Sequence, residues 1–206
     1  MSITTKLSFI HRFRPASQLA RPTLLLLHGT GGNEDDLLQL GEAIAPGSAL
    51  LSPRGQVLED GMPRFFRRLR EGVFDEQDVR RRANELADFI ADARHAYSLP
   101  APFAVGFSNG ASVAAAVLQL RPMALAGAVL LRVMTPLHDP PTSDLRGKPI
   151  LIISGAADPI VPAGNASELA SRLTTAGAVV QHRVLAAGHG LAQADVSLAK
   201  TWIDQL

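Results

Sequence analysis

A serine flanked by glycines lies in the segment GFSNGAS, residues 106–112, directly after the apolar run PAPFAV. Ser108 follows an expected strand and precedes an expected helix, which is the setting of a nucleophile elbow. Gly106 and Gly110 permit a close approach of strand and helix, where a β-carbon would clash. The same serine could instead be an ordinary helix N-cap, a common role for this residue type. The five-residue pattern alone leaves both interpretations open.

A serine hydroxyl is a weak nucleophile at neutral pH, so a nucleophilic Ser108 needs a general base. The chain contains six histidines, which are His11, His28, His95, His138, His182 and His189. His189 lies in AAGHG between the expected last strand and last helix, and its two flanking glycines let the imidazole reach over the sheet edge. We predict His189 as the base, because the order serine, acid, histidine is the one used by folds with this elbow. His138, in a proline-rich loop, is the second choice.

The predicted acid is Asp158 in SGAADPIVP, which follows an apolar strand and precedes His189. A carboxylate in this role holds the imidazole in the required tautomer and stabilises the imidazolium. The alternative is an aspartate that starts a turn before Pro159, which is a common arrangement. Asp139 and Asp144 are other candidate acids, but neither directly follows a strand end.

An acyl-transfer site also needs two backbone N–H groups that bind the developing oxyanion. One is expected from Asn109, the residue after the nucleophile, and the other from Thr30 in the loop HGTGG, residues 28–32. His28 is then a structural residue that braces this loop. HGTGG could otherwise be a phosphate-binding turn, but it lacks both the G-x-G-x-x-G spacing and a P-loop lysine.

The elements that must position these side chains alternate along the chain. Short apolar runs that predict buried strands span residues 23–29, 48–55, 101–108, 126–133, 148–155 and 178–185. Segments with helical spacing span residues 33–45, 75–97, 109–122, 168–177 and 190–206. This alternation predicts a mostly parallel sheet with helices on both faces. The segments that carry the candidate residues all fall at the carboxyl ends of strands, where such sheets bind ligands.

Composition narrows the class of protein. The 206 residues suit one α/β domain over 1–206, and a net charge of +1 gives no field that would favour nucleic acid. Cysteine is absent, which excludes disulfides, a thiol nucleophile and thiolate metal sites. The most apolar stretch, TLLLLHG, is too short to span a bilayer, and the N-terminus lacks a signal-peptide core. A cytoplasmic protein is predicted, and a homodimer is left open.

The acyl pocket is harder to predict. Residues 56–74 combine glycine, proline and aromatics with the arginines Arg64, Arg67, Arg68 and Arg70, in no clear period. One hypothesis is a flap with an apolar slot and a basic rim that favours substrates carrying a carboxylate or phosphate. The other is a solvated basic face above packed aromatics. The candidate substrate contacts are Phe65, Phe66 and Met134.

Four motifs in this order and spacing, LLLLHGTGGNEDDL, GFSNGA, SGAADPIVP and AAGHGL, resemble the small α/β-hydrolase serine esterases. The chain is most similar to the bacterial carboxylesterase/phospholipase branch related to acyl-protein thioesterases, near a subgroup linked to hydroquinone stress. The resemblance covers residues from about 22 to the C-terminus. It implies an α/β-hydrolase fold without a large cap, a Ser108–Asp158–His189 triad, oxyanion donors at Thr30 and Asn109, and no metal or cofactor.

The predicted function is therefore a serine hydrolase that cleaves carboxylic esters or thioesters of small to medium acyl groups through an acyl-enzyme. Two alternatives remain at this stage. One is a non-catalytic small-molecule binding protein on the same fold. The other is a C–C or ring-opening hydrolase of aromatic breakdown products, since fold and catalytic machinery do not determine the substrate.

Overall fold

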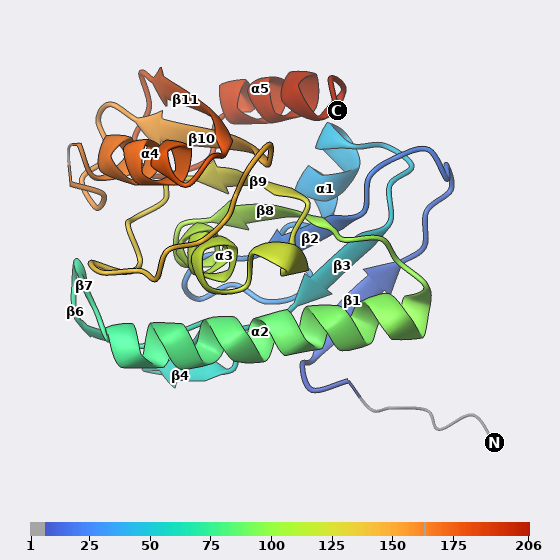
Figure 1. Cartoon of the computed structure of the whole chain (residues 1–206), viewed down its shortest axis with the longest axis horizontal. Coiled ribbons are helices and arrows are strands. Elements are labelled where there is room, and N and C mark those ends of the chain that lie inside the picture. Colours follow the sequence, from blue (N-terminus) through green and yellow to red (C-terminus); the bar gives the residue numbers. More distant parts are fainter. Residues whose placement is uncertain (1–6, 163) are drawn as a thin grey trace.

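A seven-stranded, mostly parallel sheet forms the centre of the molecule in the computed structural model, which describes residues 7–162 and 164–206 (Figure 1). All neighbouring strands are parallel except β1, which pairs antiparallel with β3. In spatial order the strands are β1 (His11–Arg14), β3 (Leu50–Pro53), β2 (Leu24–Leu27), β8 (Phe103–Phe107), β9 (Gly127–Leu131), β10 (Pro149–Gly155) and β11 (Val179–Leu185).

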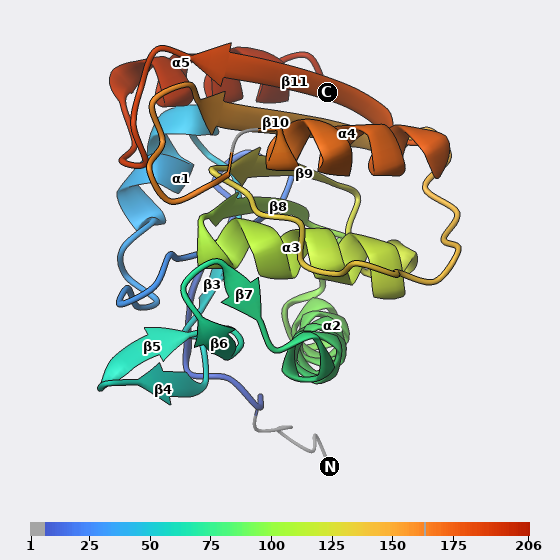
Figure 2. The ribbon, with the colours of Figure 1, turned by 90° about the vertical axis from the view of Figure 1, so that its left-hand side faces the viewer.

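Helices cover both faces of this sheet. They are α1 (Leu38–Ile44), α2 (Glu76–Tyr97), α3 (Asn109–Leu120), the 3₁₀ turn η1 (Pro122–Ala124), α4 (Asn165–Thr175) and α5 (Gln193–Ile203). Figure 2 shows α1 and α5 on one face of the sheet and α2, α3 and α4 on the other. The predicted mostly parallel sheet with helices on both faces is thereby confirmed.

The strand β2 shows why the apolar runs become buried strands. All four of its leucines are inaccessible to solvent. Successive side chains of a strand point to opposite faces, so Leu25 and Leu27 join the core under α2, α3 and α4, while Leu24 and Leu26 join the core under α1 and α5. Burial on both faces explains why the run is continuously apolar instead of alternating.

Two local predictions need correction. The helix expected over residues 33–45 is only α1, because polar side chains before Leu38 make other bonds: Asn33 Oδ1 accepts from the backbone N–H of Asp35, and buried Glu34 pairs with Arg54. Such side-chain bonds compete with helix formation. The strand β1, which begins at His11, lies outside the apolar runs that predict the buried strands of the sheet.

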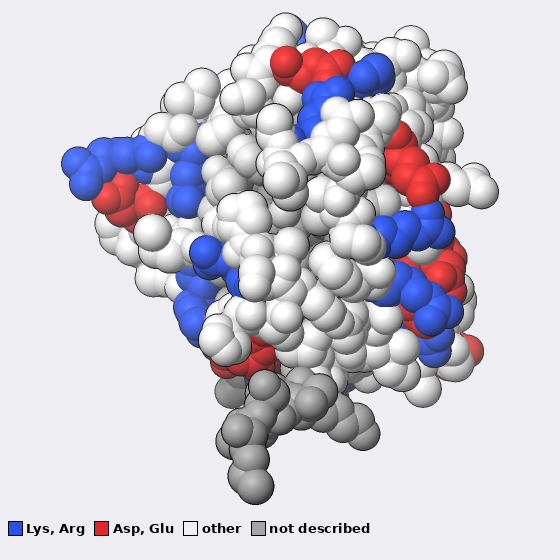
Figure 3. Space-filling model, turned by 90° about the vertical axis from the view of Figure 1, so that its right-hand side faces the viewer, with Lys and Arg blue, Asp and Glu red and all other residues white. Residues whose placement is uncertain are grey.

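The segment 56–74 forms two hairpins beside the N-terminal end of α3 (Figure 2). The first consists of β4 (Val57–Glu59) and β5 (Met62–Arg64), and the second of β6 (Arg68–Arg70) and β7 (Val73–Phe74). On the face shown in Figure 3, acidic and basic side chains lie next to one another around a largely uncharged centre, so this face carries no extended basic patch. None of the helices in the described ranges has the length and apolar character needed to cross a bilayer.

Candidate active site

Ser108 lies in a strained turn between β8 and α3. Its φ of 52° and ψ of −113° are unusual for a residue with a β-carbon. Its backbone N–H donates to the carbonyl of Leu131 over 2.8 Å, which fixes the turn against β9. The side chain makes no N-cap hydrogen bond to the helix. The geometry therefore contradicts the interpretation of Ser108 as an ordinary helix N-cap.

The two glycines of the motif allow this turn to pack closely. A β-carbon on Gly110 would lie 2.0 Å from the carbonyl oxygen of Leu27, and one on Gly106 would lie 2.6 Å from the Cα of Ala111. Both obstacles are backbone atoms, which cannot move aside as a flexible side chain can. The close contact of α3 with β2 and β8 therefore requires glycine at both positions.

The structure brings Ser108, His189 and Asp158 together. His189 Nε2 lies 3.0 Å from Ser108 Oγ, and His189 Nδ1 lies 2.8 Å from Asp158 Oδ2. An ionised carboxylate only accepts hydrogen bonds, so Nδ1 carries the ring proton and Nε2 is left as the acceptor for the serine hydroxyl. This arrangement allows His189 to take the proton of Ser108.

Asp158 is held as a carboxylate. Its side chain is 2% exposed, and its Oδ1 accepts from the backbone N–H groups of Ile160 and Val161 over 2.8 and 3.1 Å. Burial acts to raise the pKa of Asp158, but the N–H groups of Ile160 and Val161 and the ring of His189 outweigh it and lower the pKa below its ordinary value. The group therefore stays charged throughout the neutral range.

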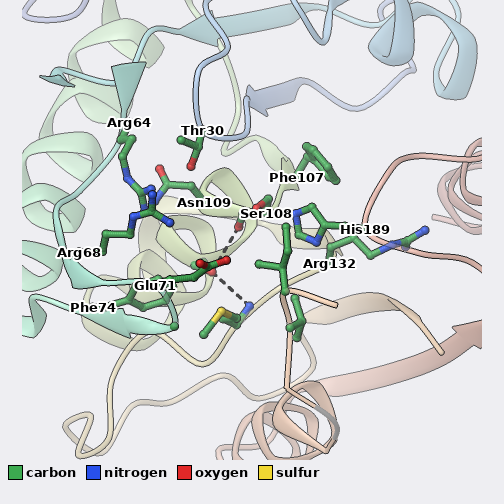
Figure 4. Close-up of a pocket in the computed structure, with 15 residues that line it drawn as sticks. Thr30, Arg64, Arg68, Glu71, Phe74, Phe107, Ser108, Asn109, Arg132 and His189 are labelled. Carbon is green, nitrogen blue, oxygen red and sulfur yellow. Dashed lines mark hydrogen bonds between the residues drawn. The ribbon is translucent and has the colours of Figure 1, made fainter. Parts of the chain in front are cut away.

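Backbone donors lie on the other side of the serine. Figure 4 shows Ser108 between His189 and the pair Asn109 and Thr30. Within the described residues, the backbone N–H groups of Thr30 and Asn109 have no hydrogen-bond acceptor. Asn109 is also the first residue of α3, whose N-terminus attracts negative charge. The Asn109 side chain is occupied elsewhere, since its Oδ1 accepts from the backbone N–H of Phe65.

His28 braces the loop that carries Thr30. Its Nε2 accepts from the backbone N–H of Gly55 over 2.9 Å, so Nδ1 carries the proton that is donated to the carbonyl of Gly29 over 2.7 Å. Burial is the main cause that lowers the pKa of His28. The ring is therefore neutral, and both of its nitrogens are used in hydrogen bonds that hold the backbone of the loop.

A pocket of about 300 Å³ opens onto Ser108. Its walls include Thr30, Arg64, Arg68, Glu71, Phe74, Phe107, Asn109, Arg132, Met134 and His189 (Figure 4). Met134 thus lies where a substrate contact was predicted. Arg67 lies outside this wall, 62% exposed and paired with Asp75.

The prediction that Phe65 and Phe66 contact substrate needs correction, because both rings lie in the core instead of lining the pocket. The bond from the Phe65 N–H to Asn109 fixes the backbone, and the Phe65 ring packs against His28 at a centroid distance of 4.8 Å. The Phe66 ring packs edge-on against Phe74. Among these aromatic residues, Phe74 is the one that faces the pocket.

Three of the other titratable candidates, His138, His182 and Asp144, have side-chain partners elsewhere. The ring of His138 is 95% exposed and pairs with Glu76, and His182 Nε2 bonds to Ser154 Oγ. Asp144 pairs with Arg146. In residues 7–162 and 164–206, no group of three or more His, Asp or Glu side chains is arranged to hold a metal ion.

Sequence reasoning missed two buried polar residues at the site. Ser112 Oγ donates to the carbonyl of Ser108 and accepts from the backbone N–H of Met134. Arg132 is fully buried with a φ of 54°, directly after β9. Its signal in the sequence was a single charged residue within the apolar run AGAVLLRV.

Comparison with known proteins agrees with this geometry. The model of the phospholipase/carboxylesterase family matches residues 11–206. The chain is 45% identical over 181 residues to "Putative hydrolase MhqD" of Bacillus subtilis, covering 87% of this chain and 90% of that protein. The Bacillus cereus carboxylesterase structure superposes with a TM-score of 0.94 at 43% identity, covering 96% of this chain and 94% of that one. A structure of YahD with malic acid superposes with a TM-score of 0.90 at 27% identity, covering 96% and 98%.

Proposed function

Because the chain belongs to the phospholipase/carboxylesterase family of hydrolases, we propose that it cleaves carboxylic esters or thioesters through a covalent acyl-enzyme formed on Ser108. The observation that carries this proposal is the unbroken series of contacts from Ser108 through His189 to Asp158, with distances of 3.0 and 2.8 Å. The ester-hydrolase class itself follows from the family and its carboxylesterase relatives.

In the first half of the reaction, Ser108 Oγ attacks the substrate carbonyl while His189 Nε2 takes the hydroxyl proton. Asp158 holds the ring and stabilises the imidazolium that forms. The carbonyl oxygen becomes an oxyanion that accepts from the N–H groups of Thr30 and Asn109. The carbon–oxygen or carbon–sulfur bond then breaks, and the leaving alcohol or thiol takes the proton from His189.

In the second half, water replaces the leaving group. His189 takes one proton from water as its oxygen attacks the acyl carbonyl, and the same two N–H groups bind the second oxyanion. The bond to Ser108 Oγ breaks, and the serine regains its proton from His189. The carboxylic acid leaves, and the enzyme returns to its starting state.

Two features of the pocket bear on the size and the charge of the acyl group. Its volume of about 300 Å³ lies at the lower end of the range for small-molecule sites. Arg64 and Arg68 line the pocket and share the single carboxylate of Glu59, and Glu71 also lines it, so charges of both signs face an acyl group there. The malic acid in the YahD structure is in keeping with an acyl group that carries a carboxylate.

Hydrolysis of p-nitrophenyl esters of graded chain length tests the proposal, with the Ser108→Ala variant as control. We expect turnover that is highest for short chains and that falls by several orders of magnitude in Ser108→Ala. Labelling by a fluorophosphonate probe is expected in the wild type alone. Absence of both turnover and labelling, with thioesters included, favours a binding protein and contradicts the proposal. Activity confined to carbon–carbon bonds in ring-cleavage products favours the third class.

A further inference from the structure

We propose that Arg132 is a positioning residue for His189, which ties the loop carrying the base to the strand end that holds the nucleophile. This inference rests on the proposed serine-hydrolase function. Arg132 lies directly after β9, and its side chain is inaccessible to solvent. A buried guanidinium costs much free energy unless all its donors are paired, so its partners indicate what it does.

Two of these partners flank His189. Arg132 Nε donates to the carbonyl of Gly188 over 2.9 Å, and Nη2 donates to the carbonyl of Gly190 over 3.3 Å. The two glycines have little packing around them: a β-carbon at Gly188 would meet nothing closer than 3.8 Å, and one at Gly190 would meet nothing within 4 Å. Side-chain packing at these two glycines is therefore slight, and the bonds to Arg132 hold the backbone on both sides of His189, in addition to the contacts of the His189 ring with Asp158 and Phe107.

A third partner fixes the helix that follows the loop. Asp195 in α5 accepts from Arg132 Nη1 and Nη2 over 2.8 and 2.9 Å, in a two-pronged pair whose carboxylate is also buried. Its Oδ2 also accepts from the backbone N–H of Ala192, just before the helix begins. The guanidinium thus holds the chain on both sides of His189.

The same strand end holds the nucleophile. The carbonyl of Leu131 accepts from the backbone N–H of Ser108. The next residue, Arg132, donates hydrogen bonds to the loop that carries His189. Arg132 has a φ of 54°, a conformation that needs support from its surroundings. Its backbone N–H donates to Ile153 of the neighbouring strand β10 over 2.9 Å, which supplies that support. Adjacent residues therefore position the serine and the histidine relative to each other.

Figure 4 distinguishes this role from substrate binding. The side chain of Arg132 extends past His189 and away from Ser108, so its charged end does not face the reacting serine. Loss of the hydrogen bonds from Arg132 to the His189 loop is therefore expected to alter the distance between His189 and Ser108 and to leave substrate affinity nearly unchanged. A displacement of about 1 Å in a catalytic group can lower the rate about a hundredfold.

The test is a double variant, Arg132→Met with Asp195→Leu, which removes both buried charges together and leaves neither one uncompensated. We expect kcat for a p-nitrophenyl ester to fall about a hundredfold and KM to stay within about twofold of wild type. The rate of fluorophosphonate labelling is expected to fall in parallel. The single variant Arg132→Lys retains the charge but not the planar fork of donors, and we expect it to fall at least tenfold in kcat.

The control is Leu173→Ala in α4, which removes a fully buried side chain from the core distant from His189. It lowers the melting temperature, and we expect its kcat below that temperature to equal the wild-type value. The positioning role is overturned if kcat falls in Leu173→Ala by as much as in the double variant for the same loss of melting temperature. Wild-type kcat in the double variant overturns it as well.

If the double variant does not fold, Arg132→Lys decides alone, and wild-type kcat in it overturns the inference. Wild-type protein without any ester or thioester hydrolysis contradicts the proposed function instead.

Discussion

Replacing Gly110 by alanine tests whether the close packing of α3 against β2 builds the site. The added methyl carbon would lie 2.0 Å from the carbonyl oxygen of Leu27 and 2.6 Å from that of His28. Real β-carbons essentially never approach other atoms closer than 3.0 Å, so α3 or β2 must shift by about 1 Å. Both obstacles belong to the backbone at the carboxyl end of a central strand.

The expected cost follows from this geometry. Overpacking a core typically costs about 1–3 kcal/mol, and we expect about 3 kcal/mol because no side chain can rotate away. For a chain of this length, that corresponds to a fall in melting temperature of about 6–12 °C. The shift also moves the N-terminus of α3 away from the loop of Thr30, which separates the two proposed oxyanion donors. We expect kcat to fall about a hundredfold.

The assay combines thermal unfolding with ester hydrolysis, and Gly147→Ala is the matched control. Gly147 has a φ of 72° and open space around it, so alanine there adds left-handed strain of about 1–2 kcal/mol without a clash. We expect Gly147→Ala to melt a few degrees lower and to keep wild-type kcat. A Gly110→Ala variant with wild-type melting temperature and kcat refutes the reasoning.

Three further predictions concern the charges at the site. The folded pKa of His28 lies below its ordinary value of 6.5, so the unfolded chain binds more protons and the free energy of unfolding falls as pH drops below about 6.5. Urea titrations between pH 5 and 7 should show that the free energy of unfolding depends less steeply on pH in His28→Asn than in the wild type. An equal pH dependence in both proteins would contradict a buried, neutral ring at His28. Asp158→Asn should lower kcat about 10⁴-fold with KM little changed, because the amide favours the wrong tautomer of the histidine; loss of less than about tenfold contradicts its role. Arg68→Gln should raise KM for an ester with a carboxylate on its acyl group more than KM for a neutral ester. Glu71→Gln should lower KM for the carboxylate ester relative to the neutral one, because the two residues carry opposite charges at the same pocket. Equal changes in KM for both esters exclude a basic rim.

Much of the fold follows from local patterns in the sequence. Strands buried on both faces need continuous apolar runs, and the segment LLLL of β2 satisfies this without ambiguity. Helices such as α2 carry acidic residues at the start and basic residues at the end, which agrees with the helix dipole. The strand-to-helix order also places Ser108, Asp158 and His189 at one sheet edge, because carboxyl ends of parallel strands meet there.

What the sequence did not predict depends on long-range partners. Residue type alone places Phe65 and Phe66 in the pocket, but the backbone N–H of Phe65 donates to the side chain of Asn109, 44 positions away, and both rings lie in the core. No local pattern marks Arg132, because its partners Gly188 and Asp195 lie 56 and 63 positions further along the chain. The late start of the helix predicted at 33–45 depends on Glu34, whose partner Arg54 follows the next strand.

Mass spectrometry of the acid-quenched protein during turnover of p-nitrophenyl acetate tests the central claim most directly. The account predicts a protein whose mass is increased by one acetyl group, with the modification on the peptide containing Ser108 and absent from Ser108→Ala. Turnover that persists in Ser108→Ala, or an acetyl group located on another residue during productive turnover, would contradict it.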